Sequence, residues 1–268
     1  MMSSFSMNSD RYMVSARYYD EAYAATQPAL IDAPFYLELA QRTGAPVFEL
    51  GCGTGRVLLP IARAGLEIHG LDLSEAMLDV LRSRVAGEPA EVQSRVEIHR
   101  GDMRSFRGQQ KYALVTIPFR PMQHMYTVDE QVKALETAAF HLRAGGVLAF
   151  DVFFPRFEML GAGIGEERLE IEWKDTLLPG RMVRRYLRNE AVDKVRQSFT
   201  ATFIYRTYEH GVLVKEETAP LKMSYYTYPH LRALFLLAEL EVVEEYGSFG
   251  KAPLDNDAKD MIFVLKKR

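Results

Sequence analysis

Short apolar runs alternate with amphipathic stretches up to Pro155, which is typical of a parallel sheet covered by helices. Most of these runs end at a glycine, an acid or a proline. The pattern predicts buried strands, because the strands of a parallel sheet are apolar on both faces. The predicted strands lie at residues 46–50, 67–72, 96–99, 112–117 and 147–154. Helices are predicted at residues 32–43, 56–64 and 129–142, with a further helix capped by Ser74.

Beyond Pro155 the pattern changes to a period of two. Leu169, Ile171 and Trp173 alternate with charged residues, which predicts a strand with one solvated face. The turn pairs Pro179-Gly180 and His210-Gly211 separate further alternating segments. These segments lie at residues 181–189, 194–209 and 212–226, and a helix at 229–240 with strands at 241–246 and 261–266 follows. The chain therefore predicts an antiparallel sheet inserted into a parallel one.

Residues 47–57 join a strand to a helix through a glycine turn, V-F-E-L-G-C-G-T-G-R-V. Gly51, Gly53 and Gly55 allow positive φ, and their missing Cβ atoms let a ligand lie against the backbone. Amides at the start of the next helix favour a negatively charged group. Asp72 ends the next strand 21 residues after Gly51, close to the ~20 expected for an acid that binds ribose hydroxyls. The turn predicts a site for a small charged cofactor, although Asp72 also suits a helix cap.

At these residues the chain resembles the class I S-adenosylmethionine-dependent methyltransferases. Their first motif, E/D-x-G-x-G-x-G, is matched by residues 49–55, and their second-strand acid by Asp72. Residues 100–106, R-G-D-M-R-S-F, resemble the loop that contacts adenine in this family. The resemblance implies S-adenosylmethionine as the cofactor. The glycine spacing disfavours the alternative of a nicotinamide-dependent oxidoreductase, whose motif is G-x-G-x-x-G.

The predicted cofactor site gathers residues from the turn, the second strand, the adenine loop, the fourth strand and the N-terminal segment. Its members are Tyr19, Glu49, Gly51, Cys52, Gly53, Asp72, Leu73, Met77, Gly101, Asp102, Met103 and Ile117. Glu49 lies on a strand that should be buried, where it either meets the cofactor or holds the glycine turn. Cys52, the one cysteine of the chain, is expected to fill space and not to act as a nucleophile.

The loop after the fourth strand, I-P-F-R-P-M-Q-H-M at residues 117–125, carries His124. Class I enzymes place reacting groups in this loop, and the lack of an N/D-P-P-Y/F motif disfavours nucleic-acid bases as acceptors. The histidine, residues 101–106 and the D-V-F-F-P run at 151–155 resemble small-molecule N-methyltransferases of antibiotic-sugar and lincosamide biosynthesis. That resemblance implies His124 as the proton acceptor and Tyr12 as a residue that orients the acceptor. The alternative is that His124 is an ordinary loop histidine.

The resemblance also implies the fold, an α/β Rossmann-like seven-stranded methyltransferase fold with an inserted antiparallel β-sheet cap. Residues 1–31 are expected to form a tyrosine-rich lid over the cofactor. Residues 32–155 and 229–268 would form the core that binds S-adenosylmethionine. Residues 156–228 would form a substrate cap at the carboxyl ends of the parallel strands, where open α/β sheets bind ligands.

Composition narrows the partners and the location of the protein. A net charge of −3 over 268 residues gives no general attraction to phosphate backbones, which disfavours nucleic acid. No stretch reaches the ~20 apolar residues of a membrane span. A single cysteine excludes an internal disulfide and suits the cytoplasm. The other histidines show no spacing typical of a metal site, and they are His69, His99, His141, His210 and His230.

We therefore expect a cytoplasmic methyltransferase that moves a methyl group to an amine or hydroxyl of a small molecule. We expect no metal, nucleic-acid or membrane partner, and the sequence leaves the oligomeric state open between a monomer and a homodimer. The alternative from another functional class is a sensor or scaffold that binds S-adenosylmethionine without catalysis.

Overall fold

A computed structural model describes residues 18, 32–155, 157, 163–174 and 178–268 of the chain. Its larger sheet has seven strands in the order β10-β11-β5-β4-β1-β2-β3. β11 runs antiparallel to both of its neighbours, β10 and β5, and the other strand pairs of this sheet are parallel. The strands are β1 (Val47–Leu50), β2 (Ile68–Asp72), β3 (Val96–Arg100), β4 (Tyr112–Ile117), β5 (Leu142–Phe153), β10 (Leu240–Tyr246) and β11 (Asp260–Lys267).

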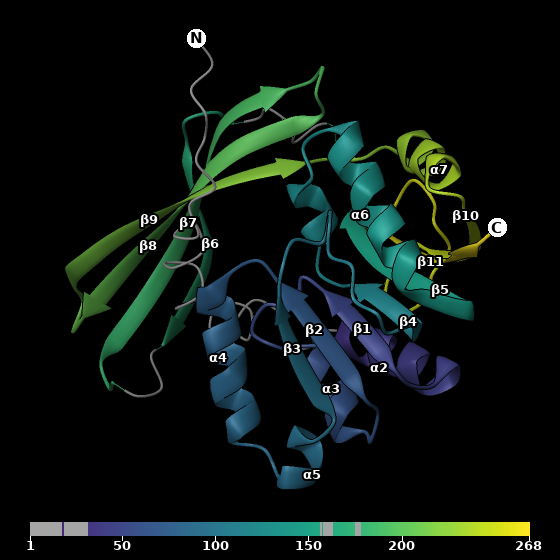
Figure 1. Ribbon diagram of the computed structural model, residues 1–268. Helices are drawn as coiled ribbons and strands as arrows, with labels where there is room; N and C mark the ends of the chain where they lie inside the picture. The colour runs from purple at the N-terminus through teal and green to yellow at the C-terminus, as the bar shows by residue number, and fades with distance from the viewer. Residues whose placement is uncertain (1–17, 19–31, 156, 158–162, 175–177) are drawn as a thin grey trace.

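Helices cover both faces of this sheet (Figure 1). Neighbouring residues of its strands point to opposite faces, so side chains on both faces need to be covered. The described helices are α2 (Asp32–Thr43), α3 (Leu58–Arg63), α4 (Glu75–Ala86), α5 (Ala90–Gln93), α6 (Val128–His141) and α7 (Tyr228–Leu237). Val47 and Leu114 belong to a core shared with α2, α3 and α4, whereas Phe48 and Val115 belong to a core shared with α6 and α7. Within the described ranges, no helix is both long enough and apolar enough to cross a membrane.

A separate antiparallel sheet of four strands follows β5, with the strand order β6-β7-β8-β9 (Figure 1). Its strands are β6 (Glu167–Lys174), β7 (Arg181–Asp193), β8 (Ser198–Glu209) and β9 (Val212–Ser224). The predicted fold class, a seven-stranded Rossmann-like sheet with an inserted antiparallel sheet, is therefore confirmed. Tyr18 packs on this second sheet, with its ring stacked on Tyr205 at 4.7 Å between centroids and its hydroxyl donating to Glu217 Oε2 at 2.6 Å.

Buried hydrogen bonds tie the end of β9 to the 3-10 helix η2 (Pro121–His124), which follows β4. Gln123 Nε2 donates to Ser224 O at 2.8 Å, and Gln123 Oε1 accepts from Phe153 N at 3.2 Å. Ser224 Oγ donates to Met125 O at 2.8 Å. The antiparallel sheet is thus attached where the parallel strands have their carboxyl ends.

Three local predictions differ from the structure. The strand predicted to begin at residue 147 begins at Leu142, because Gly145, at φ 74°, and Gly146 continue the strand through an irregular register with β4. The segment predicted to begin at residue 194 begins at Ser198, and Val195 lies 90% exposed in the turn between β7 and β8. Leu169 is 49% exposed, since a bulge between Leu169 and Ile171 breaks the alternation.

Candidate functional site

Backbone hydrogen bonds join the glycine turn after β1 to the end of β2. Gly51 N and Cys52 N both donate to Leu71 O, at 2.7 and 3.0 Å. The turn needs glycine because Gly51 and Gly53 have φ values of 75° and 53°. A Cβ on Gly53 would meet no described atom within 4 Å. The backbone at Gly53 therefore faces open space in which a ligand can lie.

Asp72 is held at this turn by two amides. Its Oδ2 accepts from Gly53 N at 2.9 Å, and its Oδ1 accepts from Ser74 N at 2.8 Å. Burial raises the pKa of Asp72, while the same two amide hydrogen bonds lower it. A carboxylate offers about four lone-pair sites, so acceptor capacity for two hydroxyl donors remains. Ser74, and not Asp72, caps α4 by accepting from Met77 N at 3.4 Å.

The loop after β3 lies beside Asp72, because Gly101 N donates to Asp72 O at 3.0 Å. In this loop Arg104 binds both oxygens of Asp102, with its Nε 2.9 Å from Oδ1. Burial alone would raise the pKa of Asp102, but the hydrogen bonds and charge of Arg104 outweigh it and lower this pKa. Asp102 is thus ionised and fixed in place. Met103 is buried next to it, at 8% exposure.

The remaining predicted cofactor residues differ in their exposure. Leu73 is exposed at the end of β2, whereas the side chains of Met77, Ile117 and Cys52 are buried. Burial raises the pKa of the Cys52 thiol well above its ordinary value, which agrees with a residue that fills space and is not a nucleophile. Tyr12 and Tyr19 lie outside the described residues, so their roles stay predictions.

Glu49 is buried in β1, and its Oε2 has no hydrogen-bond partner in the described part of the chain. Burial raises its pKa well above the ordinary value, although the charge of Arg56 lowers it. Arg56 itself forms a two-armed ion pair with the buried carboxylate of Asp32, at 2.5 and 2.6 Å. An unpaired buried oxygen beside the glycine turn is unusual and is available to a donor from a bound ligand.

A strained loop connects β4 to η2. Phe119 and Arg120 both have left-handed φ values, 63° and 74°, which non-glycine residues adopt only where the surroundings enforce it. Asp151 supplies that constraint, since its Oδ1 accepts from Phe119 N at 2.8 Å and from Tyr36 OH at 2.7 Å. Arg120 is held by Asp260 at 3.0 Å. These contacts fix the direction in which η2 leaves the sheet.

His124 is the last residue of η2 and is half-buried. At the other end of η2, Pro121 packs so closely on Gly51 that a Cβ there would lie 2.7 Å from Pro121 Cγ. The short helix therefore runs from the glycine turn to His124. The structure brings together the predicted turn, Asp72 and the adenine loop through hydrogen bonds, and it adds the His124 helix through this contact.

Sequence reasoning missed the polar network behind the site. The sequence predicts Asp32 only as the start of a helix. It gives Asp151 only as part of the D-V-F-F-P run that resembles small-molecule N-methyltransferases. The one sequence signal was an acid inside the apolar run of β5, since a buried carboxylate requires partners. Those partners, Tyr36 and the Phe119 amide, could not be identified from the sequence.

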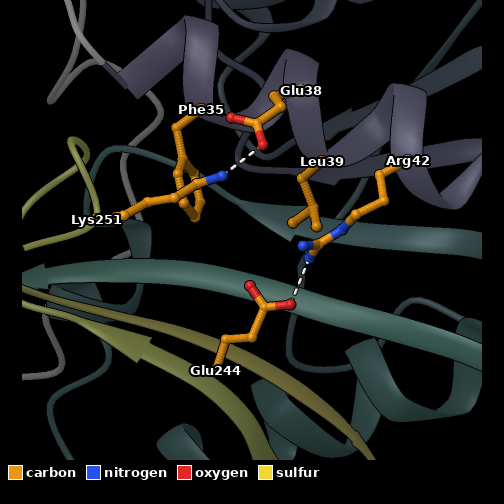
Figure 2. Close-up of a pocket in the computed structure, with 6 residues that line it drawn as sticks. All are labelled: Phe35, Glu38, Leu39, Arg42, Glu244 and Lys251. Atoms are coloured by element: carbon orange, nitrogen blue, oxygen red, sulfur yellow. Dashed lines mark hydrogen bonds and ion pairs between the residues drawn. The ribbon is translucent and has the colours of Figure 1, made fainter.

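A surface hollow beside α2 contains none of the predicted site residues (Figure 2). Its charged groups neutralise one another, because Glu38 pairs with Lys251 and Arg42 pairs with Glu244. Phe35 and Leu39 form the rest of its wall. The hollow offers no unpaired chemistry, so we place the functional site at the glycine turn.

Comparison with known proteins agrees with this geometry. Residues 47–146 match the family described as a methyltransferase domain. The chain is 25% identical to cypemycin N-terminal methyltransferase of Streptomyces sp over 225 residues, which are 84% of each protein. It is 33% identical over 107 residues to dTDP-3-amino-3,6-dideoxy-alpha-D-glucopyranose N,N-dimethyltransferase of Streptomyces fradiae, about 40% of this chain and 39% of that protein.

The structure of the CcbJ methyltransferase from Streptomyces caelestis is 27% identical and superposes with a TM-score of 0.79, covering 94% of this chain and 95% of that one. The residues present fit S-adenosylmethionine: space is open over Gly53, and Asp72 keeps acceptor capacity for ribose hydroxyls. The matched domain spans β1 to the start of β5 and so contains both features. The chain is a class I S-adenosylmethionine-dependent methyltransferase, and S-adenosylmethionine is its cofactor.

Proposed function

We propose that this enzyme methylates an amine of a small molecule, and that His124 accepts the proton that the amine loses. The observation that carries the proposal is the course of η2, which begins against Gly51 of the cofactor turn and ends at His124. His124 is half-buried and follows three positions after Pro121, the residue that packs on Gly51, and its neighbour Gln123 bonds to the attached antiparallel sheet.

The surroundings of η2 suit a small acceptor. Phe153 from β5 and Phe199 from β8 face each other across the two sheets, with 6.2 Å between ring centroids. Arg120 lies 5.6 Å from the Phe153 ring. Aromatic walls with a few polar groups are typical of sites for small organic ligands.

Relatives favour an amine over a hydroxyl. Several relatives are named as N,N-dimethyltransferases of dTDP-linked amino sugars, from Streptomyces venezuelae, Streptomyces fradiae and Saccharopolyspora spinosa. Cypemycin N-terminal methyltransferase is also named for an amino group, at the end of a peptide. An amine is the chemistry that these names share, and we infer the same acceptor group for this chain.

Catalysis by this chain rests on alignment and on proton removal. When bound, S-adenosylmethionine supplies a methyl group on a positively charged sulfur, ready for transfer to a nitrogen lone pair with S-adenosylhomocysteine as the by-product. The glycine turn and Asp72 would fix the donor side. Holding two reactants in line can supply about 7–11 kcal/mol of a barrier. His124 would take the proton from the methylated nitrogen, since imidazole titrates near neutral pH.

The acceptor class is tested with labelled methyl donor and three matched acceptor sets. The sets are dTDP-linked amino sugars, the same sugars with a hydroxyl in place of the amine, and short peptides with a free N-terminus. Transfer to the amino sugars alone is the expected result. Transfer to the hydroxyl sugars alone would overturn the amine, and transfer to peptides alone would overturn the small-molecule acceptor.

The role of His124 is tested by His124→Ala. Turnover should fall by roughly 10²–10⁴-fold, the usual contribution of a general base, while affinity for S-adenosylmethionine stays within a few-fold. His210→Ala, in the exposed turn between β8 and β9, is the matched control and should turn over as wild type does. A loss of only a few-fold in His124→Ala would show that the amine loses its proton to solvent.

A further inference from the structure

We propose that His69, Glu97 and His99 form a binding site for a divalent transition metal, Zn²⁺, at the edge of the seven-stranded sheet. This site is separate from the cofactor turn and from His124. One donor atom from each of the three side chains lies within 4.8 Å of the others. Imidazole nitrogen and carboxylate oxygen are ordinary zinc ligands.

Two tripeptides of the same sequence place these side chains. Glu67-Ile68-His69 leads into β2, and Glu97-Ile98-His99 lies in β3. Residues two apart in a strand point to the same face. The parallel register sets His69 opposite Glu97 and Leu71 opposite His99, and β2 and β3 run side by side at the sheet edge (Figure 1). The spacing of histidines along the chain did not indicate this cluster, because its ligands come from two strands.

The separations between Glu97 and the two histidines are longer than direct hydrogen bonds and leave space for a metal ion. Glu97 Oε2 lies 3.5 Å from His69 Nε2, and Glu97 Oε1 lies 3.3 Å from His99 Nε2. Both exceed the 2.7–3.2 Å of an N–H···O hydrogen bond. Ligands at 2.0–2.2 Å around a tetrahedral Zn²⁺ lie about 3.3–3.6 Å apart. Each of these two separations matches one edge of a zinc tetrahedron, with a different oxygen of Glu97 on each, and one donor atom from each of the three side chains lies within 4.8 Å of the others.

Neighbouring polar groups orient the ligands as an outer shell does in metal sites. The Tyr112 hydroxyl lies 3.0 Å from His69 Nδ1 in the buried interior, which leaves Nε2 directed at the cluster. Glu67 Oε1, 3.2 Å from His69 Nε2, is the nearest further donor, and Gln110 Nε2 holds it at 2.9 Å. The cluster is accessible, since Glu97 is 58% and His99 27% exposed at the side chain.

The bound metal would join the edge strand β3 to β2 and brace the adenine loop. His99 stands at the end of β3, three residues before Asp102. Its ring packs on Phe106 of that loop, with 5.4 Å between centroids. The site is therefore a structural one, with no part in methyl transfer.

The test uses the full chain without a polyhistidine tag, stripped of metal with a chelator. Zn²⁺ is titrated against a chromogenic chelator, and Co²⁺ is added separately as a spectroscopic probe. We expect one Zn²⁺ per chain, a higher Tm with Zn²⁺ and the intense visible absorption of tetrahedral Co²⁺. The variants Glu97→Gln and His99→Asn should weaken Zn²⁺ binding at least 10-fold.

The matched control is His210→Asn, which leaves the cluster intact and should bind Zn²⁺ as wild type does. Circular dichroism of the metal-free variants shows whether they are folded. If His99→Asn does not fold, Glu97→Gln still tests the proposal, because Glu97 is at an exposed position. Equal Zn²⁺ affinity in wild type and Glu97→Gln would overturn the proposal. So would wild-type Co²⁺ spectra without tetrahedral bands.

Discussion

At the scale of single residues, Asp72 is the most important residue of the predicted cofactor site. Its two oxygens each accept one backbone amide, which fixes the carboxylate and leaves capacity to accept further hydrogen bonds. If these oxygens bind the ribose hydroxyls, substitution of Asp72 should lower the affinity for S-adenosylmethionine.

Asp72→Ala should weaken binding of S-adenosylmethionine by about 1–3 kcal/mol, the scale for leaving polar partners unpaired. Asp72→Asn, which keeps acceptor oxygen, should lose less. Calorimetry measures both affinities, with Asp79→Ala on the exposed face of α4 as the control. Unchanged affinity in Asp72→Ala would remove this residue from the site.

Asp151 makes a prediction about pH. Burial raises its pKa from 3.8 to about 6 in the folded chain. A carboxyl whose pKa rises on folding binds more protons in the folded state, so its contribution to stability is fully present below pH ~4. That contribution is lost as the pH rises through about 6. The loss amounts to about 2–3 kcal/mol, at 1.36 kcal/mol for each pH unit between the two pKa values.

Asp151→Asn removes this ionisation, so its free energy of unfolding relative to wild type should rise between pH 4 and pH 7. Urea unfolding at a series of pH values measures the difference. Asp257→Asn, at an exposed loop position, should keep a constant offset from wild type. A constant offset for Asp151→Asn as well would mean that Asp151 keeps its ordinary pKa in the folded chain.

At the scale of elements, the glycine turn and its flanking strand and helix form the predicted cofactor-binding unit. Gly53 and Gly65 make a matched pair, because both have positive φ, 53° and 93°, and a Cβ on either meets no described atom within 4 Å. Only Gly53 lies in the predicted cofactor site. The two positions therefore separate backbone strain from ligand exclusion.

Gly53→Ala and Gly65→Ala should each lower the free energy of unfolding by about 1–2 kcal/mol, the cost of left-handed backbone with a side chain. Only Gly53→Ala should also weaken S-adenosylmethionine binding, by 10-fold or more, since the new methyl group enters the ligand's space. Thermal unfolding and calorimetry give the two readouts. An equal loss of affinity in both variants would show that strain alone weakens binding.

At the scale of the whole molecule, Gln123 links the two sheets. Its amide bridges Ser224 O at the end of β9 and Phe153 N at the end of β5, and the side chain is fully buried. Together with the buried bonds from Ser224 Oγ to Met125 O and from Tyr226 OH to Met122 O, these bonds hold the antiparallel sheet at the carboxyl edge of the parallel strands.

Gln123→Leu should lower the free energy of unfolding by about 2–4 kcal/mol, since two backbone groups lose their partner. It should also raise the KM for the acceptor while the affinity for S-adenosylmethionine is kept. Tyr126→Phe removes a half-buried hydroxyl bond to Lys222 O and should cost about 0.5–1.5 kcal/mol. Equal effects of the two changes would mean that the Gln123 bridge does not position the sheet.

The sequence by itself determined the order of the elements and the conformation of the glycine turn. Apolar runs and period-two stretches fix strand type locally, since each depends on residues only a few positions apart. The same holds for the conformation of Gly51 and Gly53 and for the position of Asp72, which follow from backbone sterics and a fixed spacing. These parts were predictable because their physical causes lie within about one strand–helix unit. The roles of these residues in cofactor binding stay predictions.

Only the tertiary structure decided which distant polar groups meet. Tyr36 and Asp151 are 115 residues apart, and the sequence around either residue does not indicate that the two side chains are partners. The bulge at Leu169 and the pairing of two Glu-Ile-His tripeptides were equally hidden, because strand register is set by packing across the sheet and not by local sequence. Long-range partners are selected by burial, which strips polar groups of water and leaves stable only those arrangements in which they find each other.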